Sequence, residues 1–185
     1  MRTSFASRWQ SSIVLILMPI VAGGCGFEIP TGGSDGTEVA KSIDGKFQVT
    51  MPTGWSVQSE LNDAADIQVA NPFKEGYLVV LSESKADFEK PTMEWHSETT
   101  RTGVLESLTD GQVTVGPKSL DINGKPAVQY EIRGMTDGLK VIYLHTTVDT
   151  GDHLHQILAW TLTSYYDDNR PILDSVINSF KSVSP

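Results

Sequence analysis

The chain has 185 residues, a length that one domain with its own hydrophobic core can have. Its 23 acidic residues outnumber its 14 basic residues, which gives a formal net charge of −9 at pH 7. A surface of this sign repels phosphate backbones and anionic lipid headgroups, so the composition argues against nucleic-acid binding. The single cysteine excludes a disulfide within the chain.

Residues 1–24 have the order of a secretory signal, with Arg2 and Arg8, an apolar run at 13–22, and small residues before Cys25. As a helix, the apolar run covers about 15 Å, half of the roughly 30 Å core of a bilayer, so a retained membrane span is not expected. With cysteine at the next position, the segment resembles the lipobox of bacterial lipoproteins. We therefore predict that residues 1–24 are removed and that Cys25 becomes the lipidated N-terminus.

The segment that begins with the lipidated cysteine, residues 25–40, is rich in glycine and polar side chains and has few apolar side chains to bury. This composition predicts a flexible tether, with a single domain at residues 41–183. Gly26 stands where an aspartate would resemble an inner-membrane retention signal of Gram-negative bacteria. Its presence favours the outer membrane, if the host has one.

The first half of the domain alternates apolar and polar residues in short runs, which predicts strands. These strands are expected at 46–51, 55–57, 66–70 and 77–81. Residues 92–109 have the composition of a helix, although several threonines and a glycine weaken that prediction.

The second half is rich in strand signals and ends in a helix. Strands are expected at 112–115, 119–122, 127–134, 139–149 and 153–163, and apolar residues at helical spacing predict a helix over 172–180. Ser164 or Asp168 could cap this helix, and Pro171 is tolerable only in its first turns. The order predicts an α+β fold, a mainly antiparallel sheet flanked by helices.

Three local patterns resemble those of a known family. They are an opening strand with a Pro-Gly-Trp corner (47–55), an Asn-Gly hairpin leading into a long strand (122–130), and the closing helix (172–180). Together they resemble the PsbP-like fold family, which includes PsbP and bacterial lipoproteins of the DcrB type. The resemblance implies an α/β/α sandwich, an accessory, assembly or binding role, and no enzymatic activity. Trp55 is expected to close one end of the core.

Three of the four histidines lie near the turn that follows Asp149. A three-residue loop at 149–151 would pair His145 with His155 and place both on one sheet face with His153. Three imidazoles on neighbouring strands suit Zn²⁺ or Cu²⁺. A two-residue turn at 150–151 would put His145 on the opposite face and remove the site. The simpler alternative is that these are polar residues near a hairpin end, without a ligand.

Catalytic patterns find little support in the sequence. There is no Gly-x-Ser-x-Gly elbow, and neighbouring carboxylates such as Asp167 and Asp168 are expected to cap a helix. His96 is expected to be a packing residue of the first helix, on a face with Met93 and Thr100, and not a fourth metal ligand. An envelope hydrolase is therefore the least favoured class.

Aromatic residues at helix edges offer another route to binding. Trp95, Tyr165 and Tyr166 would mark a partner surface if they were exposed together, and core residues otherwise. The sequence thus predicts a non-catalytic lipoprotein that is anchored to a membrane and binds an unidentified protein or small ligand, without a cofactor. The alternative is a zinc- or copper-binding envelope protein.

Overall fold

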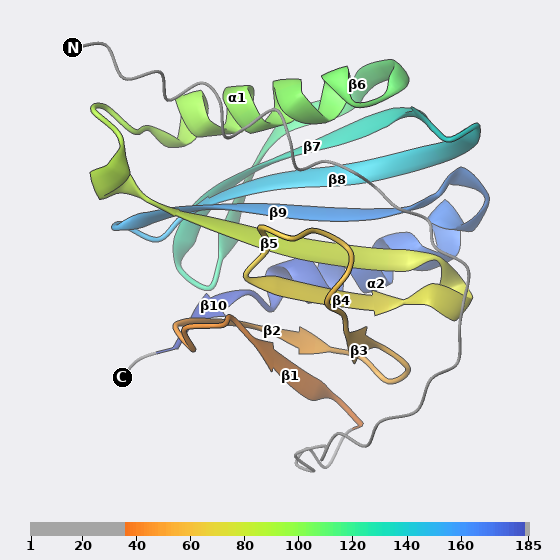
Figure 1. Cartoon of the computed structure of the whole chain (residues 1–185), viewed down its shortest axis with the longest axis horizontal. Helices are drawn as coiled ribbons and strands as arrows, with labels where there is room; N and C mark the ends of the chain where they lie inside the picture. Colours follow the sequence, from red (N-terminus) through yellow and green to blue (C-terminus); the bar gives the residue numbers. More distant parts are fainter. Residues whose placement is uncertain (1–35, 184–185) are drawn as a thin grey trace.

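The computed structural model describes residues 36–183, which form two antiparallel sheets and two α-helices (Figure 1). The large sheet has seven strands in the order β3-β4-β5-β9-β8-β7-β6, and the small sheet has the order β1-β2-β10. The strands are β1 (Glu38–Lys41), β2 (Phe47–Met51), β3 (Ser56–Val57), β4 (Ile67–Asn71), β5 (Gly76–Ser84), β6 (Thr109–Ile122), β7 (Lys125–Thr136), β8 (Leu139–Asp149), β9 (His153–Leu162) and β10 (Lys181–Ser182).

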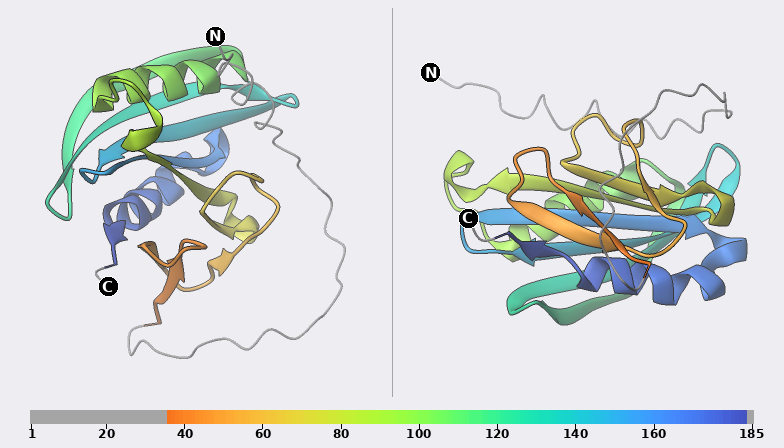
Figure 2. Two further views of the ribbon diagram at one scale, coloured as in Figure 1. Left: turned by 60° about the vertical axis from the view of Figure 1, so that its left-hand side comes forward. Right: turned by 90° about the horizontal axis from the view of Figure 1, so that it is seen from below.

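The two α-helices cover opposite faces of the large sheet. Helix α1 (Met93–Glu106) packs on one face, and helix α2 (Tyr166–Asn178) packs on the other together with strand β2 (Figure 2). Side chains on both faces of the central strands are therefore buried, and in β8 and β9 nearly every residue is buried. This arrangement confirms the predicted α+β class and the α/β/α layering.

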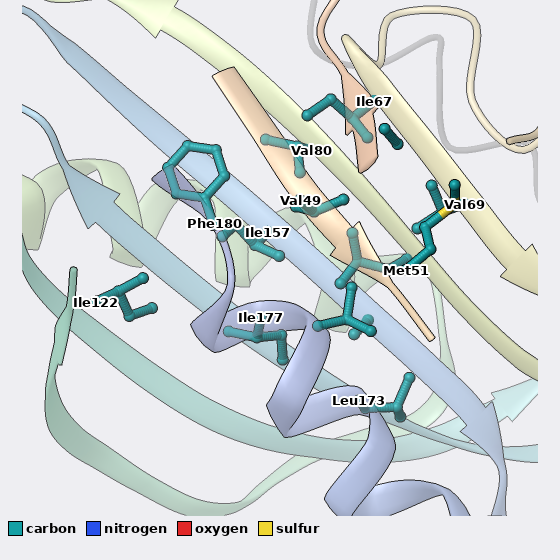
Figure 3. Packing of buried hydrophobic residues seen from close by; sticks show 14 of the residues in the cluster. Val49, Met51, Ile67, Val69, Val80, Ile122, Ile157, Leu173, Ile177 and Phe180 are labelled. Atoms are coloured by element: carbon teal, nitrogen blue, oxygen red, sulfur yellow. The ribbon is translucent and has the colours of Figure 1, made fainter. Parts of the chain in front are cut away.

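The larger core lies between the sheet, α2 and β2. In β2, Phe47, Val49 and Met51 point inward and alternate with half-buried residues, as the sequence predicted. Leu173, Val176, Ile177 and Phe180, from α2 and the residues that follow it, meet them across the layer (Figure 3). Burial of each large side chain stabilises the fold by about 1.5–3 kcal/mol, so this face holds the small sheet in place.

The smaller core lies under α1. Its apolar members include Val104, Leu108, Tyr143 and Trp160, and the Trp160 ring stacks on Tyr77 at a centroid distance of 5.3 Å. The fully buried residues of α1 itself are mostly polar: His96, Ser97, Thr100 and Val104. Helix α1 is therefore held to the sheet by a polar layer at its N-terminal half and by apolar contacts only near its end.

Strand β6 is one continuous edge strand where two separate strands were predicted. It pairs with β7 along its length, with register shifts that include one between Val115 and Lys118. Gly116 lies in this region with φ +122°, and a Cβ there would stand 2.7 Å from the Tyr130 ring. The turn residues that suggested a break are accommodated as an irregularity within the strand.

The start of α2 also differs from the prediction. A 3₁₀ turn at Thr163–Tyr165 leads directly into the helix at Tyr166, and no side chain caps it, so neither Ser164 nor Asp168 is the cap. Asp167 and Asp168 instead lie in the first turn, where their charge favours the helix dipole. Pro171 lies in the second turn of the helix, which agrees with the expectation that it is tolerable only in the first turns.

The folded part begins before the predicted domain boundary. Strand β1 pairs Glu38 with Met51 and Lys41 with Gln48, so the last residues of the predicted 25–40 tether belong to the small sheet. Cys25 and the predicted signal at 1–24 lie outside the described residues. Within residues 36–183, neither helix has the length and apolar character to span a bilayer.

Candidate functional site

The β8–β9 hairpin determines which histidines face one another. The Thr150 N–H donates to the His153 carbonyl at 3.0 Å, so the turn consists of Gly151 and Asp152, with Gly151 at φ +101°. The register pairs Val148 with His155. The predicted pairing of His145 with His155 is therefore wrong. The shift is by an odd number of residues, so it moves one histidine to the other face of the sheet.

The three histidines consequently do not form one site. His145 pairs with Leu158 on the face covered by α1, while His155 contacts Phe47 and Phe180 on the face covered by α2. Only His153 lies near His155, with ring centroids 6.0 Å apart. Among the described residues, no group of three or more His, Cys, Asp or Glu side chains is arranged to hold a metal ion. The predicted zinc or copper site at His145, His153 and His155 is not supported.

His155 is a core residue with both ring nitrogens engaged. Nδ1 lies 2.9 Å from the Ser82 hydroxyl and Nε2 lies 2.9 Å from the Thr150 hydroxyl. The ring packs edge-on against Phe47 at a centroid distance of 4.3 Å. Burial, reinforced by repulsion from His153, lowers the pKa of His155 to about 3. The imidazole is therefore neutral at pH 7 and acts as a structural hydrogen-bonding group.

His96, on α1, and His145, on β8, both lie where α1 packs on the large sheet. The His145 Nε2 is 2.8 Å from the Thr100 hydroxyl, and the His96 Nε2 is 3.1 Å from a carboxylate oxygen of Glu83 on β5. Burial, with repulsion from His96 and Arg101, lowers the pKa of His145 to about 3. The prediction that His96 is a packing residue of this helix agrees with its burial. Neither ring is accessible to a dissolved substrate.

A buried carboxylate that the sequence analysis missed joins α2 to the sheet. Glu131 on β7 accepts hydrogen bonds from the Tyr166 hydroxyl, Arg133 Nε (3.0 Å), the Thr114 hydroxyl (2.9 Å) and Arg170 Nη1 (3.3 Å). Burial alone would raise the pKa of Glu131, but the bonds from Tyr166, Arg133 and Thr114 outweigh it and hold the pKa below its ordinary value. The Glu131 carboxylate is thus ionised, and the guanidinium groups of Arg133 and Arg170 balance its charge.

The aromatic residues that were predicted to mark a partner surface fall into different surroundings. Trp95 is 41% exposed near the start of α1 and packs edge-on against Phe88. Tyr166 is partly buried in the Glu131 network. Tyr165 is 42% exposed in the connection that follows β9, whereas Trp95 lies beside His96, which contacts Glu83 at the end of β5, opposite the start of β9. The two aromatic residues therefore lie toward opposite ends of the sheet.

Two further exposed apolar residues lie at the end of the large sheet where β9 leads into Tyr165. Phe73, at the tip of the β4–β5 turn, is 90% exposed, and Leu139, at the start of β8, is 40% exposed. Strands β5, β9 and β8 are neighbours, with Gly76 opposite Thr161 and Val141 opposite Leu162, so these side chains share one sheet end. We call Phe73, Leu139 and Tyr165 the Phe73 surface.

Tyr165 was among the predicted partner-surface residues, but Phe73 was not. Residues 71–76 were predicted only as a turn between strands. The available signal was an aromatic residue between proline and lysine at the tip of that turn, where burial is not expected.

No protein-family model and no curated protein matches the chain. Solved structures do match in fold. The solution structure of cyanobacterial PsbP (CyanoP) from Synechocystis sp. PCC 6803 has a TM-score of 0.62 at 15% identity, covering 87% of this chain and 98% of that one. LpqN, involved in cell envelope biogenesis of Mycobacterium tuberculosis, has a TM-score of 0.59 at 13% identity, covering 80% of this chain and 91% of that one.

A third match comes from a eukaryote. The Saccharomyces cerevisiae Ran-binding protein Mog1p has a TM-score of 0.54 at 11% identity, covering 82% of this chain and 97% of that one. The TM-scores establish a shared fold, whereas identities this low carry no activity over to this chain. The chain therefore has the fold of the PsbP-like family that its sequence resembles.

Proposed function

We propose that the chain is a non-catalytic accessory domain of the bacterial cell envelope, tethered through a lipid on Cys25, that binds a partner protein through the Phe73 surface. The observation that carries the binding role is Phe73 itself, an aromatic side chain left 90% exposed at the tip of an ordered turn. Structural neighbours of this fold include a protein involved in cell envelope biogenesis, which supports the envelope setting.

The turn that presents Phe73 is fixed in position. Pro72–Lys74 form a 3₁₀ turn, and the Asn169 side-chain amide donates to the Lys74 carbonyl at 2.6 Å and to the Thr161 hydroxyl at 2.8 Å. An exposed aromatic group on a rigid support loses little conformational entropy on binding, which is typical of residues that dominate protein interfaces.

The environment of the histidines supports a non-catalytic role. The imidazoles of His145 and His155 are buried and neutral at pH 7, with their contacts made to core rings and hydroxyl groups. A general acid or base needs a titratable group that reaches the substrate, and neither ring does so.

Photo-crosslinking in the native host tests the binding role. With p-benzoylphenylalanine at position 73 of the full chain, irradiation is expected to give a covalent adduct of higher mass with a membrane or envelope protein. Position 43 is the matched control, because Ile43 is 89% exposed in the β1–β2 turn, away from the Phe73 surface. Equal adduct yields at the two positions, or none at 73, would contradict the proposed surface.

The lipid anchor has its own test. The unmodified full chain is expected to take up an alkyne-labelled fatty acid and to sediment with membranes, whereas Cys25→Ser is expected to lose both properties because the acceptor thiol is gone. The described sheets and helices are built from residues 36–183, so this variant is expected to retain the thermal unfolding transition of the unmodified chain. Equal fatty-acid labelling of Cys25→Ser and the unmodified chain would contradict the Cys25 thiol as the acceptor.

A further inference from the structure

The β6–β7 hairpin is fastened to the end of helix α2 through one side chain. The two strands are joined by Asn123 and Gly124, whose φ angles of +52° and +78° are both positive, as a tight two-residue hairpin turn requires. The Asn123 side-chain amide donates to the Asn178 carbonyl at 3.0 Å and to the Phe180 carbonyl at 2.8 Å. We call these two hydrogen bonds the Asn123 latch.

The Asn123 latch joins two segments that bury side chains in the same core. Asn178 is the last residue of α2, and the last four carbonyls of a helix have no partner within the helix itself. Phe180, which provides the second carbonyl, is 1% exposed and belongs to the larger core, as does Ile122 on the hairpin. The latch therefore satisfies a helix end and holds the hairpin against it.

An asparagine that precedes glycine reacts readily with its own backbone, because glycine has no side chain to obstruct the attack. The Gly124 nitrogen, after loss of its proton, forms a bond to the side-chain Cγ of Asn123. The bond from Cγ to Nδ2 breaks, and ammonia leaves. Water then opens the resulting succinimide ring and gives aspartate or isoaspartate. The pair at 123–124 is the only Asn-Gly sequence in the chain.

In the folded chain, other partners hold both of the groups that would react. The Asn123 amide gives its two protons to carbonyls of another segment, which keeps it from turning toward the Gly124 nitrogen. The Gly124 N–H donates to Asp121 Oδ1 at 2.8 Å, and the negative charge of this carboxylate disfavours removal of the proton. Asn123 and Gly124 are both exposed, so water reaches the turn as soon as these bonds open.

We propose that Asn123 is a deamidation site at which opening of the β6–β7 hairpin becomes permanent. The amide is protected while the Asn123 latch is closed, and it reacts when the hairpin separates from α2. The product carries an ionised carboxylate, which has no proton to donate. This carboxylate would face two carbonyl oxygens at the negative end of the helix, so the latch does not form again.

The rate of deamidation in the unmodified full chain tests the protection. Peptide mapping by mass spectrometry, with detection of isoaspartate, follows residue 123 at pH 7.5 with and without unfolding concentrations of guanidinium chloride. A peptide of residues 119–128 corrects both rates for the effect of the denaturant itself. The corrected rate in the folded chain is expected to be about tenfold lower, because the two hydrogen bonds must open before the reaction. Equal corrected rates would overturn the proposal.

Asp121→Ala separates protection by the fold from the general reactivity of the Asn-Gly pair. This variant frees the Gly124 N–H and removes the neighbouring charge, so the rate in the folded chain is expected to rise severalfold. Asp44→Ala is the matched control, because Asp44 accepts from the Lys46 N–H in a different turn, between β1 and β2. An unchanged rate in Asp121→Ala, or an equal rise in both variants, would overturn the proposal.

Asn123→Asp reproduces one product of the reaction and measures its effect on stability. Loss of the two hydrogen bonds is expected to raise the unfolding equilibrium constant about tenfold in urea titrations. Asn178→Asp adds the same charge at the end of α2 but leaves both Asn123 donors in place, so its effect is expected to be smaller. Unchanged stability in Asn123→Asp, or equal losses in the two variants, would overturn the proposed latch.

Discussion

Lowering the pH from 7.5 to 5.0 is expected to reduce the free energy of unfolding by about 4 kcal/mol, through His145 and His155. Their pKa values are lowered to about 3 in the folded protein, against about 6.5 in the unfolded chain. Below pH 6.5 the unfolded chain therefore binds protons that the folded protein does not, and stability decreases as the pH falls from 6.5 toward 3. Each histidine contributes about 1.4 kcal/mol per pH unit in this window. Urea unfolding at the two pH values measures the loss.

Two variants assign this pH dependence to the imidazoles. His155→Leu removes one titrating ring and is expected to halve the loss between pH 7.5 and 5.0, although its stability at pH 7.5 is also lower. Thr150→Val removes only a hydroxyl partner of His155 and should retain the full loss. An unchanged loss in His155→Leu would show that the pH dependence has another source.

Replacing Glu131 is expected to be the most destabilising single change outside the hydrophobic core. Glu131→Ala removes the shared acceptor of Tyr166, Arg133 and Arg170, so Arg133 loses its carboxylate partner and the half-buried Arg170 loses one of its two. Removal of one partner from a buried charge pair costs about 3–5 kcal/mol, and partial exposure of Arg170 puts the expected loss near the lower value, about 3 kcal/mol. Chemical unfolding at pH 7.5 measures this loss.

Asp174→Ala is the matched control for Glu131→Ala. Asp174 is the other carboxylate partner of Arg170, at 2.8 Å, but it lies four residues further along α2, where 36% of its side chain is exposed against 7% for Glu131. Exposed pairs of this kind contribute about 0.3–0.5 kcal/mol. Equal losses in the two variants would show that the Glu131 network does not hold α2 to the sheet.

Most of the strands could be predicted from the sequence because a strand with one buried face must alternate apolar and polar residues. Phe47, Val49 and Met51 must face the core together, and a shift of one residue would expose all three. The same property explains the error at the β8–β9 hairpin. Residues of both faces are buried in these strands, so polarity alone does not distinguish the possible turns, and the choice decides which face holds His145.

The Glu131 network was not predictable from alternation for a related reason. Gln129, Glu131 and Arg133 alternate with apolar or aromatic residues along β7, which is typical of a solvent-exposed face. Helix α2 covers that face instead, through Tyr166 and Arg170. A contact between residues about 40 positions apart carries no local signal, so only the tertiary structure reveals that the carboxylate is buried.

The most direct test of the central claim is whether the residues of the Phe73 surface act together in binding. The adduct formed from p-benzoylphenylalanine at position 73 should be measured in chains that also carry Tyr165→Ser or Ile43→Ser. We expect Tyr165→Ser to reduce the adduct severalfold, because a shared interface loses one of its aromatic contacts, and Ile43→Ser to leave it unchanged. An adduct that is insensitive to Tyr165→Ser, or that falls equally in both, would contradict a docking role for this end of the sheet.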